Sequence, residues 1–271
     1  MLSTSYKASA VQMNSGTNVD NNLEQARRLI KQAADEGAKV IGLPENFAFL
    51  GGLSMRIERA GDIMEKAKAF LRDCSREFGI YLLGGSYPRP AGEGRVYNHS
   101  AFYGPDGTIL ASYDKIHLFD VTLSEDEAYV ESDYIRPGRP EPAVYQNESI
   151  GNWGLSVCYD LRFPEYYRQV VSDGAEILAI PSAFTYTTGR DHWLPLLQAR
   201  AIENTSYVFA PAQTGHHGKD RKTWGHAMLV DPWGEVLSDA GTEPGLASAH
   251  IDGHRLAEVR RAIPSLQHRR L

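Results

Sequence analysis

Cysteine is scarce in this sequence, because its 271 residues include only Cys74 and Cys158. Two cysteines cannot build the disulfide framework that holds many small secreted domains together. The low count is typical of proteins that work in a reducing compartment, so we expect a cytoplasmic location. The N-terminal segment MLSTSYKASAVQM also lacks the basic start and long apolar core of a secretory signal peptide.

The sequence also lacks an excess of basic residues and long apolar runs. Its formal net charge is −6, so it offers no strongly basic surface for nucleic acid or an anionic membrane. Its apolar runs are far shorter than the roughly 18 residues that a membrane-spanning helix needs. We therefore expect neither nucleic acid nor a membrane as a partner. With 42% hydrophobic and 23% charged residues, the composition is that of a globular enzyme.

Short apolar strand patterns alternate with amphipathic helical patterns along the whole chain. Two halves with the same order of strands and helices, each followed by hairpins, indicate an α/β fold of four layers. In this αββα sandwich two sheets face each other and helices cover the outside. No linker divides the halves, so residues 1–271 are expected to form a single domain. The predicted helices span residues 18–37, 62–79, 164–174 and 190–204, and residues 116–150 are predicted to be a long loop.

Three predicted strands end in polar side chains that burial alone does not explain. These are Glu45 in VIGLPENF, Lys115 in SYDKIHLFD and Cys158 in LSVCYDLRFPE. Each has a plainer interpretation: Glu45 as a solvated turn residue, Lys115 as a surface lysine and Cys158 as a core residue. Strand ends are nevertheless where α/β folds usually carry their chemistry.

Together, these three residue types can perform one reaction. A carboxylate can take the proton of a thiol, and an ammonium group stabilises the oxyanion formed when the thiol attacks an amide carbonyl. The products are an amine and a thioester, which water activated by the same carboxylate then hydrolyses. The sequence therefore favours an amide hydrolase with a cysteine nucleophile.

The segments GLPENF, YDKIHLFD and GLSVCYDLRFPE resemble the signature blocks of the nitrilase superfamily of carbon–nitrogen hydrolases. All three blocks occur in family order, and the resemblance extends over essentially the whole chain. It implies that Glu45, Lys115 and Cys158 form the catalytic triad and that the fold is an αββα sandwich. It also implies a homodimer or larger homo-oligomer, with no metal or organic cofactor.

The resemblance implies two further contributors to the site. A second glutamate precedes a Pro-Gly pair in the family, and here ESDYIRPG supplies Glu131, which is otherwise one more acid in the run SEDEAYVESD. The oxyanion hole of the family pairs the lysine with the backbone N–H after the cysteine, which here belongs to Tyr159.

The segments 180–204 and 210–234 resemble deaminated glutathione amidases within the superfamily. The omega-amidases, which act on substrates such as 2-oxoglutaramate and 2-oxosuccinamate, share YDKIHLFD, TTG and WGH and are the second choice. Both readings imply a small-molecule amide with an α-keto carboxylate. Arg162 is a candidate clamp for that carboxylate, or a partner of Asp160 or Glu165 in a structural ion pair. By resemblance Phe184 and Thr188 lie at the pocket, and otherwise they are a core and a turn residue.

Other functions are less consistent with the sequence. A cysteine–histidine mechanism would need His117 or His192 as the base, but no supporting motif surrounds either residue. The pair at 216–217 lacks a third metal ligand and is predicted to lie in a solvated loop. An inactive scaffold is expected to lack a triad residue, whereas all three are present. An acyltransferase of this superfamily would usually add membrane segments or a fused domain.

Overall fold

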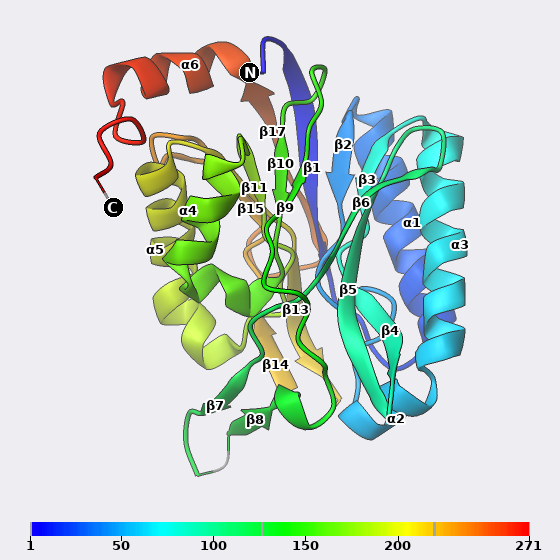
Figure 1. Cartoon of the computed structure of the whole chain (residues 1–271). Helices are drawn as coiled ribbons and strands as arrows, with labels where there is room; N and C mark the ends of the chain where they lie inside the picture. The colour runs from blue at the N-terminus through cyan, green and yellow to red at the C-terminus, as the bar shows by residue number, and fades with distance from the viewer. Residues whose placement is uncertain (1, 126, 219–220, 271) are drawn as a thin grey trace.

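The chain folds into four layers in the order helix, sheet, sheet, helix (Figure 1). The two larger sheets lie face to face at the centre, and the helices lie on the outside. This arrangement confirms the predicted αββα sandwich. The structure is a computed structural model and describes residues 2–125, 127–218 and 221–270.

The first sheet combines strands from both ends of the chain. Its long central strand β1 pairs in parallel with β2 and antiparallel with β17, from Ser5 opposite Asp252 to Gln12 opposite Gly245. Within the described residues it has nine strands, in the order β14-β13-β1-β2-β3-β5-β4, with β17 also beside β1 and β6 beside β5. Their bounds are β1 (Ser5–Met13), β2 (Val40–Gly42), β3 (Tyr81–Leu83), β4 (Tyr87–Gly92), β5 (Arg95–Tyr103), β6 (Ile109–Asp114), β13 (Ala212–His217), β14 (Arg221–Trp224) and β17 (Gly245–Asp252).

The second sheet comes entirely from the later half of the chain. Its three central strands, β10, β11 and β12, run parallel to one another, and the outer strands pair antiparallel. The order is β16-β15-β12-β11-β10-β9. Their bounds are β9 (Ala143–Tyr145), β10 (Trp153–Leu155), β11 (Ile177–Ala179), β12 (Tyr207–Ala210), β15 (Met228–Val230) and β16 (Val236–Asp239).

The four predicted helices are present and cover the outer faces of the sheets. Helices α1 (Val19–Asp35) and α3 (Ala60–Phe78) pack on the first sheet, while α4 (Pro164–Ser172) and α5 (Tyr186–Asn204) pack on the second. The N-cap of α1 is Asn18, whose side chain accepts a hydrogen bond from the backbone N–H of Asn21. Helix α5 begins four residues earlier than predicted. No helix in the described part of the chain is long and apolar enough to cross a membrane.

The two sheets approach each other closely at Gly42 of β2. A Cβ atom at this position would lie 2.3 Å from the ring of Phe209 in β12, so a larger side chain cannot fit without movement of the opposite sheet. Trp153 packs nearby against both Phe209 and Phe102, with ring centroids 5.3 and 5.4 Å apart. The packing between the sheets therefore fixes their separation, which matters because the site draws residues from both.

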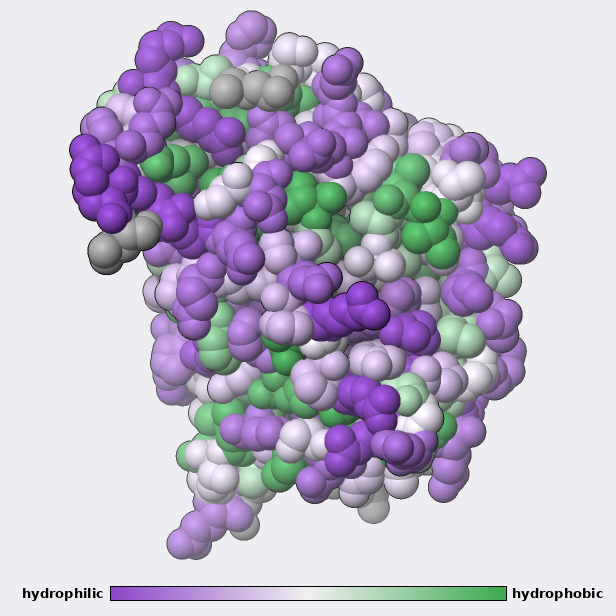
Figure 2. All heavy atoms as spheres, viewed as in Figure 1, coloured by the Kyte–Doolittle hydropathy of each residue, from purple (hydrophilic) through white to green (hydrophobic). Residues whose placement is uncertain are grey.

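Three features differ from the sequence-based expectations. Residues 116–150 are not one long loop, because they contain the hairpin β7–β8, a short 3₁₀ helix η1 and β9. The hairpin projects from one edge of the molecule (Figure 1), where Figure 2 shows hydrophilic side chains. Strand β17 and helices α2 and α6 were not anticipated. The bounds are α2 (Leu53–Glu58), β7 (Asp120–Thr122), β8 (Ala128–Val130), η1 (Glu131–Asp133) and α6 (Gly253–Ala262).

Candidate active site

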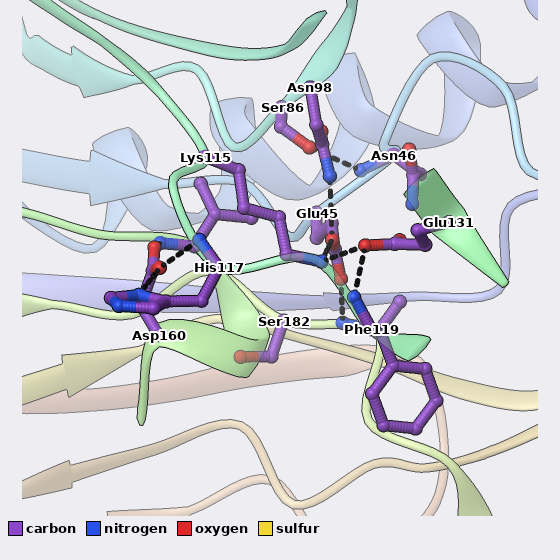
Figure 3. Close-up of polar contacts among 12 residues, drawn as sticks. Glu45, Asn46, Ser86, Asn98, Lys115, His117, Phe119, Glu131, Asp160 and Ser182 are labelled. Carbon is purple, nitrogen blue, oxygen red and sulfur yellow. Dashed lines mark hydrogen bonds and ion pairs between the residues drawn. The ribbon is translucent and has the colours of Figure 1, made fainter. Parts of the chain in front are cut away.

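Glu45 lies three residues beyond the end of β2, and only 2% of it is exposed. One carboxylate oxygen, Oε1, accepts a hydrogen bond from Nδ2 of Asn98 at 2.8 Å. The other, Oε2, accepts one from the backbone N–H of Ala183 at 2.8 Å. The carboxylate is therefore held in one orientation by two donors far apart in the sequence, and Figure 3 shows the contact with Asn98.

The surrounding charges decide the ionisation of Glu45. Burial by itself raises the pKa of this carboxyl group, but the positive charges of Lys115 and Arg221 act in the opposite direction. The thiol of Cys158 lowers the pKa further, and the net pKa lies below its usual value. Glu45 is therefore a carboxylate at neutral pH and able to accept a proton.

Lys115 directly follows β6 and is 1% exposed. Its Nζ atom lies 2.7 Å from Oε2 of Glu131 and 3.3 Å from Oε1 of Glu45, so the ammonium group bridges the two carboxylates (Figure 3). Glu131 begins η1 and also accepts a hydrogen bond from the backbone N–H of Phe119 at 2.9 Å. The structure therefore brings together the lysine and both glutamates of the sequence prediction.

The charge and position of Lys115 are both fixed by its neighbours. Burial lowers the pKa of this ammonium group, but the carboxylates of Glu131 and Glu45 outweigh burial and raise it above the usual value. The backbone N–H of Gly138 donates to the carbonyl oxygen of Lys115 at 2.9 Å. A Cβ atom at Gly138 would lie 2.0 Å from the carbonyl oxygen of Asp114, so only glycine fits there. The Pro-Gly pair thus packs directly against the backbone that carries the lysine.

Cys158 begins the 3₁₀ helix η2 (Cys158–Arg162), shortly after β10. Its φ angle is +49°, a conformation that is unusual for a residue with a side chain and costs about 1–3 kcal/mol. Its backbone N–H donates to the carbonyl oxygen of Pro181 at 3.0 Å. Burial and the nearby negative charge of Glu45 raise the pKa of the thiol well above its usual value. The resting thiol is therefore neutral and needs a base to become a nucleophile.

Asp160 connects the cysteine and lysine segments. This fully buried carboxylate accepts hydrogen bonds from the backbone N–H of Val157 at 2.8 Å and the hydroxyl of Tyr113 at 2.7 Å. It also binds His117, whose ring stacks on Phe163 with the centroids 3.7 Å apart. His117 therefore has a structural partner other than the thiol, and the geometry gives no support to a cysteine–histidine pair.

One small cavity joins the predicted catalytic and binding residues. The residues of its wall include Glu45, Lys115, Glu131, Cys158, Tyr159, Phe184 and Thr188. The hydroxyl of Thr188 lies 2.7 Å from that of Thr185, which also lines the cavity. Seven of the eight residues predicted for the site therefore meet in one place.

Arg162 is the predicted residue that lies apart from this cavity wall. Its guanidinium group lies 5.3 Å from the ring centroid of Phe184 and 3.4 Å from Nδ1 of His192. Within the described residues it forms no ion pair with Asp160 or Glu165. Arg162 thus contacts the cavity through Phe184, and its role as a carboxylate clamp stays a prediction.

Arg221 and Asn98 are two of the side chains at the site that sequence reasoning missed. Arg221 lines the cavity, and its Nη2 atom donates to the carbonyl oxygen of Ala183 at 3.3 Å. Its neighbours in the sequence are polar, which is typical of a solvated loop, so the pattern carried no signal for it. Asn98 is a fully buried polar residue in β5 that holds Glu45, and an amide in an apolar strand pattern is a signal that could have identified it.

The histidine pair at 216–217 is not in a solvated loop, so that prediction was wrong. Both residues belong to β13, and His217 is only 7% exposed. Its ring nitrogens lie 2.7 Å from the carbonyl oxygen of Ser15 and 2.7 Å from the hydroxyl of Thr223. Burial lowers the pKa of His217 to about 4. The described residues contain no group of three or more His, Cys, Asp or Glu side chains arranged to hold a metal ion.

Comparisons with known proteins show the family of this chain. Residues 7–261 match the carbon–nitrogen hydrolase family. A deaminated glutathione amidase from Synechocystis sp. is 51% identical over 97% of this chain and 98% of its own length. The human omega-amidase NIT2 is 36% identical over 98% of this chain and 96% of its own.

The solved structures include a close structural match. The NitFhit protein of C. elegans superposes with a TM-score of 0.93 and 34% identity over 100% of this chain. This chain corresponds to 66% of that longer protein. The fold, the cavity and these sequence similarities lead to one conclusion: the chain belongs to the carbon–nitrogen hydrolase family and is an amide-hydrolysing enzyme of the nitrilase type.

Proposed function

We propose that the enzyme hydrolyses the γ-amide of an α-keto acid, with deaminated glutathione as substrate and 2-oxoglutarate and cysteinylglycine as products. The observation that carries the mechanism is the position of Lys115 Nζ, between the carboxylates of Glu45 and Glu131 in the cavity that also contains Cys158. The similarity to a deaminated glutathione amidase over nearly the whole chain supports the substrate.

The first chemical step forms a thioester. Glu45 takes the thiol proton of Cys158 as the sulfur attacks the amide carbon, because the resting thiol is neutral and Glu45 is ionised. The carbonyl oxygen becomes an oxyanion, which the ammonium group of Lys115 and the backbone N–H of Tyr159 stabilise. When the C–N bond breaks, Glu45 returns the proton to the leaving nitrogen. The acyl group is then bound to the sulfur and the free amine departs.

The second step regenerates the enzyme. Glu45 removes a proton from a water molecule, whose oxygen attacks the thioester carbon. The C–S bond breaks, the thiolate of Cys158 receives the proton, and the carboxylic acid is released. Glu131 has a positioning role, because its contact of 2.7 Å keeps Lys115 charged and directed at the reacting atoms. Tyr159, Phe184, Thr188 and Arg162 are proposed to hold the acyl half of the substrate.

The second candidate function is an omega-amidase acting on 2-oxoglutaramate or 2-oxosuccinamate. The similarity to omega-amidase NIT2 supports it. Deaminated glutathione and the omega-amidase substrates all carry an α-keto acid in the acyl half. They differ in the leaving group, which is a dipeptide for deaminated glutathione and ammonia for the omega-amidase substrates. The acyl half alone therefore does not discriminate between the two functions.

The remaining proposals concern the organisation of the enzyme. Residues 1–271 are proposed to act as one catalytic domain, which is supported by a first sheet built from strands of both halves. A homodimer is proposed to form through α4, α5 and their surroundings. Three apolar side chains on this part of the chain, Leu194, Ile202 and Trp233, are 40%, 53% and 53% exposed. A cytoplasmic location is also proposed, and the two unpaired cysteines support it.

Incubation of the protein with a panel of amides and nitriles tests the proposed function. Release of 2-oxoglutarate from deaminated glutathione, with cysteinylglycine in equal amount, is the expected result. Cys158→Ala should abolish turnover and keep the fold by circular dichroism, whereas Cys74→Ala, which removes the other thiol on α3, should keep activity. Turnover of simple nitriles without turnover of keto-amides would contradict the substrate proposal, and activity in Cys158→Ala would contradict the nucleophile.

A further inference from the structure

A second and larger cavity adjoins the reaction cavity. Its volume is about 630 Å³, and the two cavities share Phe119, Glu131 and Arg221 in their walls. The remaining wall comes from residues 50–52, α2 and the hairpin β7–β8, together with residues 16–17 and 217–218. Phe184 and Thr188, the proposed contacts of the acyl half, line the reaction cavity only. The second cavity therefore extends from the reaction cavity past Phe119 and Glu131, whereas the acyl contacts belong to the reaction cavity alone.

Arg56 of α2 is an unusual component of this wall. It is only 4% exposed, and its Nε and Nη2 atoms are buried without a hydrogen-bond partner among the described residues. Burial lowers the pKa of its guanidinium group, yet arginine stays protonated at neutral pH. A buried cation with unused donors is costly unless an anion compensates it. The two acids whose charges act on Arg56, Glu131 and Glu45, already hold Lys115.

A second guanidinium group faces the same space. Arg221 lines both cavities, and its Nε atom is also buried and without a partner in the described part of the chain. The remaining acid of this wall, Glu127, accepts hydrogen bonds from the hydroxyls of Tyr129 and Thr187 at 3.2 and 2.9 Å. Neither arginine is therefore neutralised by an ion pair within the described residues.

We propose that Arg56 and Arg221 bind a carboxylate at the far end of the amine half of the substrate. This inference rests on the proposed function and deepens it, because it assigns a binding site to the part of the substrate that leaves. A guanidinium group matches a carboxylate with two parallel hydrogen bonds. The enzyme is thereby specific for amides whose amine half ends in a carboxylate.

A dipeptide amine carries its terminal carboxylate at a distance from the reacting amide. Two residues in extended conformation span about 7 Å from the amide nitrogen to the terminal carboxylate. A dipeptide such as cysteinylglycine would extend from Cys158 into the second cavity and place its carboxylate there. Ammonia, the leaving group of an omega-amidase, would leave both guanidinium groups without an anion. The site therefore favours the dipeptide-releasing reaction over release of ammonia.

The test compares three substrates that share one acyl half: deaminated glutathione, the same molecule with its terminal carboxylate converted to an amide, and 2-oxoglutaramate. The wild type should have a kcat/KM for the free acid at least about tenfold above that for the amidated form. Arg56→Met should reduce this ratio to near one, and Arg56→Lys should restore part of it. The ratio compares two substrates of the same variant, so a general loss of activity does not change it.

The control is Arg59→Met, which removes the same charge three residues away. Arg59 donates to the carbonyl oxygen of Thr17 and its guanidinium lies over the ring of Phe49, outside the wall of the second cavity. This variant should keep the wild-type ratio. If Arg56→Met does not fold, as judged by circular dichroism, Arg221→Met carries the same comparison, because the ratio of the two substrates is again taken within one variant.

Binding measurements separate the two proposals. Calorimetry on Cys158→Ala should show tighter binding of deaminated glutathione than of its amidated form, and adding Arg56→Met should remove the difference. Equal kcat/KM values for the acid and the amidated form in the wild type would overturn this inference and leave the amidase function intact. Absence of turnover with every keto-amide would overturn the proposed function. In that case the difference in binding between deaminated glutathione and its amidated form would still test the carboxylate site.

Discussion

The carboxylate of Asp160 binds His117 twice, at 2.7 Å from the ring atom Nδ1 and at 3.1 Å from the backbone nitrogen. His117 lies two residues after Lys115, and Asp160 lies two residues after Cys158. This pair therefore ties together the segments that carry the proposed nucleophile and the proposed oxyanion donor. The conformation of Cys158 depends on this connection, because Asp160 also holds the backbone of Val157.

Asp160→Asn tests the importance of this connection. An amide has one acceptor oxygen instead of two, so at least one of the four donors to this carboxylate loses its partner. We expect a loss of about 1–3 kcal/mol in the free energy of unfolding, measured by urea denaturation, and a lower kcat. Asp173→Asn, at the exposed end of α4, should change neither. Equal stability of Asp160→Asn and the wild type would contradict the structural role.

The proposed mechanism predicts a broad pH optimum. Burial raises the pKa of Glu45, but the charges of Lys115 and Arg221 bring it below the usual value, so activity is lost only as the pH falls through this lowered pKa. The pKa values of Cys158 and Lys115 are raised, so neither group loses its proton near neutrality. We expect kcat/KM to be flat between about pH 6 and about pH 8.5. An acid limb centred near pH 6.5 would indicate a histidine base.

The pH dependence of Cys158 alkylation measures how the charge of Glu45 affects the pKa of the thiol, and it does not require turnover. Burial and the negative charge of Glu45 raise the pKa of this thiol, while Lys115 lowers it. Glu45→Gln should therefore abolish turnover and, at the same time, shift the pH profile of iodoacetamide alkylation to lower pH. The measurement is made in a Cys74→Ala background, which leaves one thiol. A shift to higher pH in Glu45→Gln would contradict the proposed electrostatics.

Glu131→Gln separates positioning from base catalysis. The amide cannot balance the charge of Lys115 at the 2.7 Å contact, so kcat should fall by about 10- to 100-fold. Mass spectrometry should still detect acylated Cys158, because the base and the nucleophile are intact. The matched control is Glu125→Gln, an exposed acid of the same acidic run. A kcat of Glu131→Gln equal to that of the wild type would contradict the proposed positioning role of Glu131.

Gly42→Ala tests the close contact between the sheets. The added methyl group would lie 2.3 Å from the ring of Phe209, so we expect a loss of about 1–3 kcal/mol in the free energy of unfolding. Gly61→Ala in α3 has no atom within 4 Å of the new Cβ and should be neutral or stabilising by up to about 1 kcal/mol. Thermal denaturation of the two variants provides the comparison. Equal melting temperatures would show that the sheets separate easily.

Much of the fold could be predicted because its signals are local. Helical spacing and apolar strands identified the four covering helices and both sheets. The hairpin β7–β8 was missed because its strands have three residues each and lie in an acidic segment. Strand β17 was missed because its pairing with β1 is set by contacts across the whole chain, which a local pattern does not contain.

The candidate site was predictable where its residues follow strands and belong to signature blocks. Glu45, Lys115 and Cys158 satisfy both conditions. Arg56 and Arg221 do not, because an arginine in a polar segment is typical of a solvated surface, and only the fold shows that Arg56 is buried. Whether an arginine N–H group has a hydrogen-bond partner depends on its neighbours in the fold, and the spacing of residues in the sequence does not reveal these neighbours.

The division of the reacting groups between the two sheets has a consequence for the newly made chain. Glu45 and Lys115 follow strands of the first sheet, whereas Cys158 follows a strand of the second. Until the halves dock, the sulfur has neither its proton acceptor nor its charged neighbour. If the proposed mechanism holds, an incomplete or misassembled polypeptide does not hydrolyse amides, and activity appears only with the complete tertiary structure.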